Sequence, residues 1–138
     1  MPPIARAEQR FLAFLLLGAL LLHLVYIYEY RASPFFDAPV VDARTFLAQA
    51  QLIAAGDLLG GDEPFWQPPL YIYLLAFVCW LFPQDYFTSI RLLQAAFSAL
   101  SCGLIYLLAR RVFDMATARL AAIAYLLCGT FLYFGGEL

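Results

Sequence analysis

The chain has 138 residues, of which 64% are hydrophobic and only 13% are charged. Soluble domains carry about 25% charged residues, and a domain this small could not bury so much apolar surface, so the composition excludes an ordinary soluble fold and indicates a membrane protein. The net charge of −2 excludes a basic, nucleic-acid-binding protein. The three cysteines lie within apolar segments, where packed thiols are expected in place of a disulfide or a metal site.

Three apolar segments are long enough to cross a bilayer, whose hydrocarbon core requires about 20 helical residues. They predict transmembrane helices at about 11–28, 88–109 and 120–136. The first follows Arg6 and Arg10, as the apolar region of a signal peptide would. However, its length and its flanking sequence YEYRASPFF favour a span that is retained.

A fourth apolar segment, between Pro69 and Pro83, would form a helix of only about 20 Å. If it crosses the membrane, the chain spans four times and the basic loop LARRVFDMATAR lies outside, against the preference for basic residues in the cytoplasm. If it lies in the interface, the chain spans three times and this loop shares the cytoplasm with Arg6 and Arg10. We therefore expect a multi-pass protein of the inner or plasma membrane with a cytoplasmic N-terminus. The long first loop is then periplasmic or extracellular.

The expected outer loop covers about 29–87 and contains two surface helices, at about 43–55 and 70–82. Asp42 occupies the position of an N-cap for the first helix, and Gly56 that of a C-terminal glycine. Aromatic residues are expected to anchor the second helix at the lipid surface: Trp66, Tyr71, Tyr73 and Trp80. The predicted fold class is an all-α membrane protein with three transmembrane helices and a long outer loop bearing two juxtamembrane helices.

Small residues recur every four positions in the second span, at Ala95, Ala99 and Gly103. This spacing allows close helix approach in lipid, so other transmembrane helices and membrane lipids are the expected partners. His23, the single histidine, lies in the first span. It is either a neutral packing residue or a proton relay, and the absence of a second histidine favours packing.

Two carboxylates are the candidate chemical groups, because the sequence contains no phosphate-binding glycine loop, metal-ligand spacing or nucleophile elbow. Asp42 heads a loop helix and is either a helix cap or a general base. Glu137 follows the third span, where a negative charge opposes the helix dipole unless the helix continues beyond the chain.

The order of segments resembles the N-terminal part of membrane glycosyltransferases with the GT-C fold, the protein O-mannosyltransferase and aminoarabinose transferase type of glycosyltransferase family 39. The matching segments are PVVDARTFLAQAQLIAAGD, FWQPPLYIYLLAFVCWLFP, FTSIRLLQAAFSAL, YLLARRVFD and FLYFGGEL. The resemblance implies a partial GT-C fold across residues 1–138. It also implies that the short proline-fronted helix helps to wall a donor site. Because such enzymes have eight or more spans, a fragment is expected.

The resemblance also implies roles for individual residues. Asp42 matches the first-loop aspartate that is the proposed base, and Glu137 matches an acid of a later loop that could hold a divalent cation, the acceptor or Asp42. Arg91 matches the arginine that opens the second span, and either it or Arg44 would bind the donor phosphate. Gln67 is a further substrate-binding candidate, because it stands before the double proline, where many members have a lysine that can meet a lipid phosphate. Phe46 stands where many have a tyrosine.

The implied function is transfer of a sugar from a polyprenyl-phosphate-linked donor to an acceptor hydroxyl at the outer face of the membrane. The lipid-linked donor is then the expected small-molecule partner, and a divalent cation is a candidate cofactor. The alternative is a non-enzymatic three-span protein that acts as an assembly or scaffold partner, which the small-residue repeat suits equally well.

Overall fold

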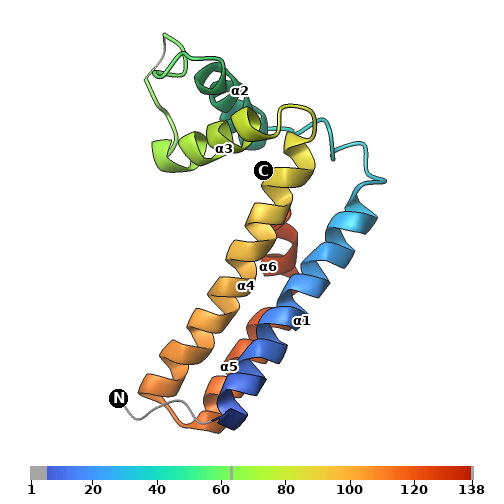
Figure 1. Ribbon diagram of the computed structural model, residues 1–138, viewed down its shortest axis with the longest axis vertical. Helices are drawn as coiled ribbons and strands as arrows, with labels where there is room; N and C mark the ends of the chain where they lie inside the picture. Colours follow the sequence, from blue (N-terminus) through green and yellow to red (C-terminus); the bar gives the residue numbers. More distant parts are fainter. Residues whose placement is uncertain (1–5, 63, 138) are drawn as a thin grey trace. The chain divides into compact units, whose positions relative to one another are not determined.

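The computed structural model describes residues 6–62 and 64–137, and within these ranges the chain forms helices and loops without strands (Figure 1). The helices are α1 (Arg6–Tyr30), α2 (Asp42–Ala54), α3 (Pro69–Leu81), α4 (Tyr86–Val112), α5 (Met115–Leu127) and α6 (Gly129–Phe134). The all-α fold class is confirmed. The described residues form two compact units: a bundle unit of residues 6–28 and 93–136, and a loop unit of residues 29–92 with Glu137.

Two helices are long and apolar enough to cross a membrane by length and composition, namely α1 with 25 residues and α4 with 27. The apolar helices α3 and α5 have 13 residues each, which corresponds to about 20 Å. The expected spans near 11–28 and 88–109 therefore coincide with long helices. The third expected span does not, and the count of three spans stays a prediction.

The segment expected to form one helix over 120–136 forms two helices instead. Cys128 has an extended backbone conformation with ψ of 106°, which ends α5 and starts α6. The break falls directly before Gly129, and glycine costs about 1 kcal/mol relative to alanine inside a helix. Hydropathy alone did not reveal this break, because the residues on both sides of Cys128 are apolar.

Small residues form the centre of the bundle unit. Its core consists of Leu15, Ala19, Ala99, Cys102, Tyr106, Ala118 and Ala122. At Gly103, a β-carbon would lie only 2.9 Å from the side chain of Leu16, so α1 approaches α4 closely at this glycine. This contact places part of the predicted small-residue repeat in a helix–helix interface, as expected for helices that pack in lipid.

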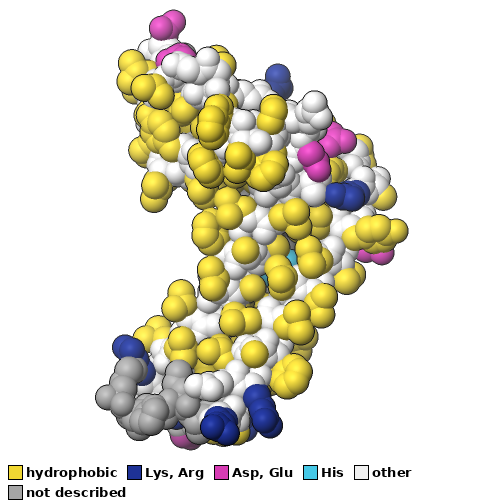
Figure 2. All heavy atoms as spheres, viewed as in Figure 1, with side chains coloured by type: hydrophobic (Ala, Val, Ile, Leu, Met, Phe, Trp, Pro, Cys, Tyr) yellow, Lys and Arg dark blue, Asp and Glu magenta, His cyan; other side chains and the backbone are white. Residues whose placement is uncertain are grey.

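A charged cluster closes one end of the bundle unit. Glu8 is 2% exposed and accepts hydrogen bonds from Tyr106 Oη (3.1 Å) and Arg110 Nη2 (2.7 Å), while Arg110 Nε forms an ion pair with the same carboxylate. The start of α1 and the end of α4 are therefore at the same end of the bundle. Figure 2 shows arginine side chains gathered at this end and apolar side chains along the rest of the bundle.

Asp114 starts α5, because its carboxylate accepts a 2.7 Å hydrogen bond from the backbone N–H of Thr117. This bond, the main cause, holds the pKa of the Asp114 carboxyl below its usual value. A side-chain cap of this kind was expected at Asp42 in the loop unit but occurs here instead.

Helices α2 and α3 pack against each other in the loop unit. Leu47, Ala50 and Ile53 are buried on α2, and the rings of Phe46 and Tyr71 meet edge to face with centroids 5.2 Å apart. Gly56 follows α2 with φ of 110°, a conformation that favours glycine, so its predicted place at the helix end is confirmed.

The GDLLGGDEP connector contains a hydrogen-bonded turn. The Asp57 carboxylate accepts from the backbone N–H groups of Leu59 and Gly61, and Tyr73 Oη donates to Leu58 O at 2.6 Å. The turn joins the connector to α3.

Three of the four predicted aromatic anchors are exposed. Trp66 is 91% exposed and Trp80 65%, whereas Tyr71 packs on α2. Exposed apolar side chains recur on α3 at helical spacing, at Leu70, Tyr73, Phe77 and Trp80. An exposed apolar stripe with aromatic residues is typical of a helix that lies in the membrane interface.

Candidate functional site

Asp42 does not cap α2, so this part of the sequence prediction is wrong. The cap position belongs to Val41, which makes no side-chain cap hydrogen bond, and Asp42 is the first helical residue. Val41 has φ of 53°, which is strained for a β-branched side chain. Within the described residues, the exposed carboxylate of Asp42 has no hydrogen-bond or ion-pair partner. The capping role that competed with a chemical role for Asp42 is therefore removed.

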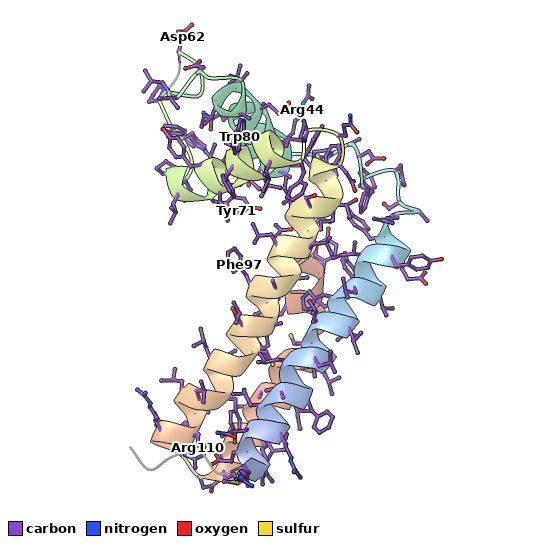
Figure 3. The ribbon with its side chains drawn as sticks, viewed as in Figure 1. Arg44, Asp62, Tyr71, Trp80, Phe97 and Arg110 are labelled. Atoms are coloured by element: carbon purple, nitrogen blue, oxygen red, sulfur yellow. The ribbon has the colours of Figure 1, made fainter. Side chains whose placement is uncertain are left out.

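A groove of about 510 Å³, the Arg44 groove, lies beside α2. Its lining is Asp37, Ala38, Pro39, Val40, Arg44, Leu47, Ala48, Gln51, Tyr86 and Phe87. The exposed guanidinium of Arg44 has no partner within the described residues, and Figure 3 shows the residue on α2. Gln51 Nε2 donates to Tyr86 Oη at 3.2 Å across the same groove. The groove thus presents one available cation beside amide and hydroxyl groups.

Asp42 lies between two lining residues, Val40 and Arg44, but does not itself line the groove. Its carboxylate stands at the N-terminus of α2, where the helix dipole stabilises negative charge.

Arg91 is buried, with 1% of its surface exposed. Its guanidinium donates to the carbonyl oxygens of Phe36 (2.9 Å) and Phe87 (3.2 Å), and its Cζ lies 4.0 Å from the Phe36 ring centroid and 5.2 Å from that of Tyr30. The sequence prediction that Arg91 binds a donor phosphate is not favoured by this burial, because phosphate would have to displace these contacts.

Glu137 belongs to the same unit as Arg91. Its Oε1 accepts a 2.8 Å hydrogen bond from Tyr30 Oη, and it interacts electrostatically with Arg91. Tyr30 was not predicted as a functional residue, because an aromatic residue at the end of an apolar segment is typical of a transmembrane helix. Sequence offers no signal for a contact between residues 107 positions apart.

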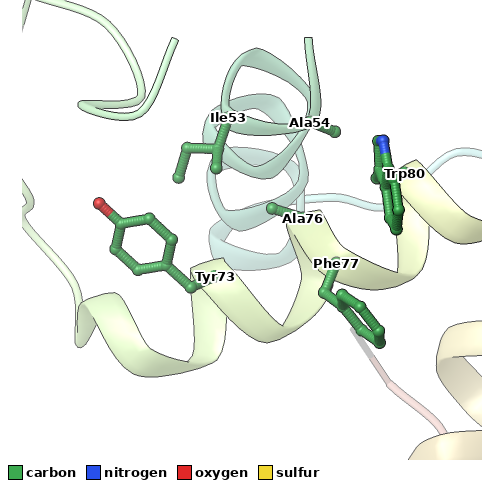
Figure 4. Close-up of a pocket in the computed structure, with 6 residues that line it drawn as sticks. All are labelled: Ile53, Ala54, Tyr73, Ala76, Phe77 and Trp80. Atoms are coloured by element: carbon green, nitrogen blue, oxygen red, sulfur yellow. The ribbon is translucent and has the colours of Figure 1, made fainter. Parts of the chain in front are cut away.

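Gln67 does not line the Arg44 groove. Its side chain is partly buried, and its Oε1 has no hydrogen-bond partner within the described residues. Another groove, of about 230 Å³, is apolar and is formed by Ile53 and Ala54 of α2 with Tyr73, Ala76, Phe77 and Trp80 of α3 (Figure 4). Residues of α2 therefore line this apolar groove, the Arg44 groove, and a further groove of about 340 Å³ that includes Gln51, Ala55 and Trp80.

The predicted site residues fall into separate environments. Arg44 lines the Arg44 groove, and Asp42 begins α2 without lining it. Arg91 and Glu137 belong to a cluster with Tyr30, and Gln67 precedes α3. In the part of the chain that the structure describes, no three histidine, cysteine or acidic side chains are grouped in a way that could hold a metal ion.

Residues 66–137 match the family described as dolichyl-phosphate-mannose-protein mannosyltransferase. No curated protein and no solved structure matches the chain. The family match covers just over half of the chain, from the residue before Gln67 through Glu137, and includes Arg91. Asp42 and Arg44 precede it. With its long apolar helices, the chain belongs to this family of membrane glycosyltransferases.

Proposed function

We propose that the protein transfers a sugar from a polyprenyl-phosphate-linked donor to an acceptor hydroxyl at the outer face of the membrane. The observation that carries this proposal is the family match over residues 66–137, which includes α3, α4, α5, α6 and Glu137. The name of the family specifies a lipid-phosphate-linked mannose and a protein acceptor, and these are the first substrates to test.

The charge distribution supports the orientation in which the loop unit faces the outer compartment. Arg110 and Arg111 occupy the last turn of α4, and the Glu8–Arg110 ion pair joins this end of α4 to the start of α1. Basic residues that flank apolar helices favour the cytoplasmic side. The opposite end of each helix leads into the loop unit, so that unit and its grooves belong outside.

The chemical step that we assign is a single displacement at the anomeric carbon. Asp42 accepts the proton of the acceptor hydroxyl while its oxygen bonds to the anomeric carbon. The bond between that carbon and the phosphate oxygen breaks, and the electron pair leaves with the lipid phosphate. Attack opposite the leaving group inverts the anomeric configuration. General-base catalysis of this kind contributes about 10²–10⁴ in rate.

Arg44 is the residue that we assign to the donor phosphate. Its guanidinium is exposed in the 510 Å³ groove, a volume within the range of small-molecule sites of about 300–1,000 Å³. A guanidinium can donate two parallel hydrogen bonds to phosphate oxygens and stabilise the charge that the leaving group gains. Arg44 is two positions from Asp42, so both residues belong to the first turn of α2.

The test uses the full-length protein in membranes, with radiolabelled mannosyl dolichyl phosphate as donor and a serine- and threonine-rich peptide as acceptor. We expect Arg44→Ala to raise the donor KM at least tenfold, because one charged phosphate contact is lost. Arg44→Lys should restore part of the affinity, since lysine binds phosphate as a point charge. The control is Arg31→Ala, because Arg31 is an exposed arginine of the same unit whose side chain contacts Thr88 and lies outside the groove.

Unchanged donor KM in Arg44→Ala would contradict the assignment of Arg44. If the wild-type protein transfers no sugar from lipid-linked mannose, glucose or aminoarabinose to any hydroxyl acceptor, the proposed activity is wrong. The scaffold alternative then stands.

A further inference from the structure

The cluster around Arg91 holds a cation that has no place in the proposed reaction. We infer that Arg91 is a positioning residue that orders both candidate carboxylates, and that it does not bind the donor. Its link to the reaction depends on the proposed function, whereas its ordering role can be tested without substrate.

The first connection runs from Arg91 to the segment that leads to Asp42. Arg91 Nη2 donates to Phe36 O at 2.9 Å, and the guanidinium lies 4.0 Å from the Phe36 ring centroid. Phe36 is followed directly by residues 37–40, which line part of the Arg44 groove, and then by strained Val41 and by Asp42. A strained conformation persists only when its surroundings hold it, and Arg91 supplies the hydrogen bond at the start of the segment.

The second connection runs from Arg91 to Glu137. Tyr30 lies with its ring 5.2 Å from the Arg91 guanidinium and donates its hydroxyl to Glu137 Oε1 at 2.8 Å. Arg91 also interacts electrostatically with Glu137 and with Asp37 in the groove wall. One buried cation at the start of α4 therefore interacts with Glu137 and with the segment that leads to Asp42.

A planar guanidinium is required for this arrangement. Arg91 donates to two carbonyl oxygens in different segments while its face covers the Phe36 ring, and an ammonium group cannot reproduce the fork or the stacking. A phosphate ligand behaves differently, because lysine serves well as a point charge for phosphate. Replacement by lysine thus separates the two roles.

Hydrogen–deuterium exchange on the full-length protein in micelles measures the ordering directly. We expect Arg91→Met to speed amide exchange in residues 36–42 and in the peptide that carries Glu137 by at least tenfold. Tyr30→Phe keeps the ring but removes the hydroxyl, so it should speed exchange only in the Glu137 peptide. Arg31→Met, an exposed neighbour, should change neither peptide by more than twofold.

Kinetics give the second measurement. Positioning predicts that Arg91→Met and Arg91→Lys both lower kcat by at least tenfold while the donor KM stays within threefold. Unchanged exchange in residues 36–42 would overturn the inference, as would a raised donor KM in Arg91→Met that Arg91→Lys restores. If Arg91→Met is not recovered folded, Arg91→Lys and Tyr30→Phe decide the question. Exchange requires no turnover, so its outcome is independent of the proposed activity.

Discussion

The two units each bury an ionisable residue, but they compensate it in different ways. In the bundle unit, the buried Glu8 carboxylate meets the opposite charge of Arg110 directly. In the loop unit, the buried cation of Arg91 donates to backbone carbonyls and lies against aromatic rings. A direct ion pair fixes two helices together, whereas a cation held by carbonyls organises the irregular segments that carry them. The comparison supports the inference that Arg91 orders segments of the loop unit, whereas the Glu8–Arg110 pair holds helices together within the bundle unit.

The prediction with the largest expected effect concerns the side of the membrane that each end of α3 faces. Single cysteines at Trp66 and Asp85, in a background without native cysteines, should both react with an impermeant thiol reagent added from outside, because the predicted three-span topology keeps both ends of α3 on the outer side. Both positions are exposed. A cysteine at exposed Asp114, between α4 and α5, is the control and should react only after the membrane is opened. Opposite labelling of the first two positions would refute the three-span topology.

Removing Arg110 from the Glu8–Arg110 ion pair should destabilise the protein more than removing the charge of Glu8. Arg110→Met leaves the Glu8 carboxylate without its cation. Because the Glu8 side chain is only 3% exposed, we expect a loss of about 3 kcal/mol in unfolding free energy. Glu8→Gln leaves Arg110, whose side chain is 32% exposed, to be hydrated, so the loss should be about 1 kcal/mol. Unfolding titrations in mixed micelles measure both values. Equal losses of unfolding free energy in the two variants would contradict the argument from the different exposure of the Glu8 and Arg110 side chains.

Two glycines of the bundle unit should respond differently to alanine. At Gly135, a β-carbon would lie 2.9 Å from the Phe131 carbonyl and from His23 Nε2, so we expect a cost of about 1–3 kcal/mol. At Gly103 the close atom is the flexible end of Leu16, and alanine favours the helix, so the change should be within about 0.5 kcal/mol of zero. The same unfolding titration compares them, and a reversed order would contradict the packing.

The smallest expected effect is at the start of α5. The hydrogen bond from Thr117 lowers the pKa of the folded Asp114 carboxyl, so its contribution to stability is present above the unfolded pKa near 4 and is lost as pH falls through the lower folded value. Asp114→Ala should slightly lower the midpoint temperature of unfolding at pH 7. This midpoint should also fall less steeply than that of the wild type as the pH is lowered. Asp114→Asn should retain most of the midpoint at pH 7, because asparagine also caps helices. An Ala variant that keeps the wild-type acid profile would exclude the cap as its cause.

Helix positions followed from the sequence where one local rule dominates. Apolar length predicted the long helices α1 and α4, and the double proline predicted where α3 begins. The α5–α6 break at Cys128 could not be predicted in the same way, because hydropathy does not report a change in backbone conformation within an apolar segment.

The candidate site was less accessible to sequence reasoning. The family resemblance singled out Asp42 and Arg91, but the capping rule placed the N-cap at Asp42, one position after the actual cap at Val41. Arginine is usually exposed, so the burial of Arg91 went against the general tendency. The Tyr30–Glu137 and Glu8–Arg110 contacts join residues about a hundred positions apart, and neither leaves a local pattern.

Asp42→Asn tests the central claim most directly, because it removes the base while nearly preserving size. Asp42 makes no cap hydrogen bond, so the variant should express and bind lipid-linked donor normally. The account predicts that single-turnover sugar transfer by the full-length protein falls by about 10²–10⁴-fold, with donor KM little changed. Transfer at a near-normal rate would contradict the assignment of Asp42 as the base.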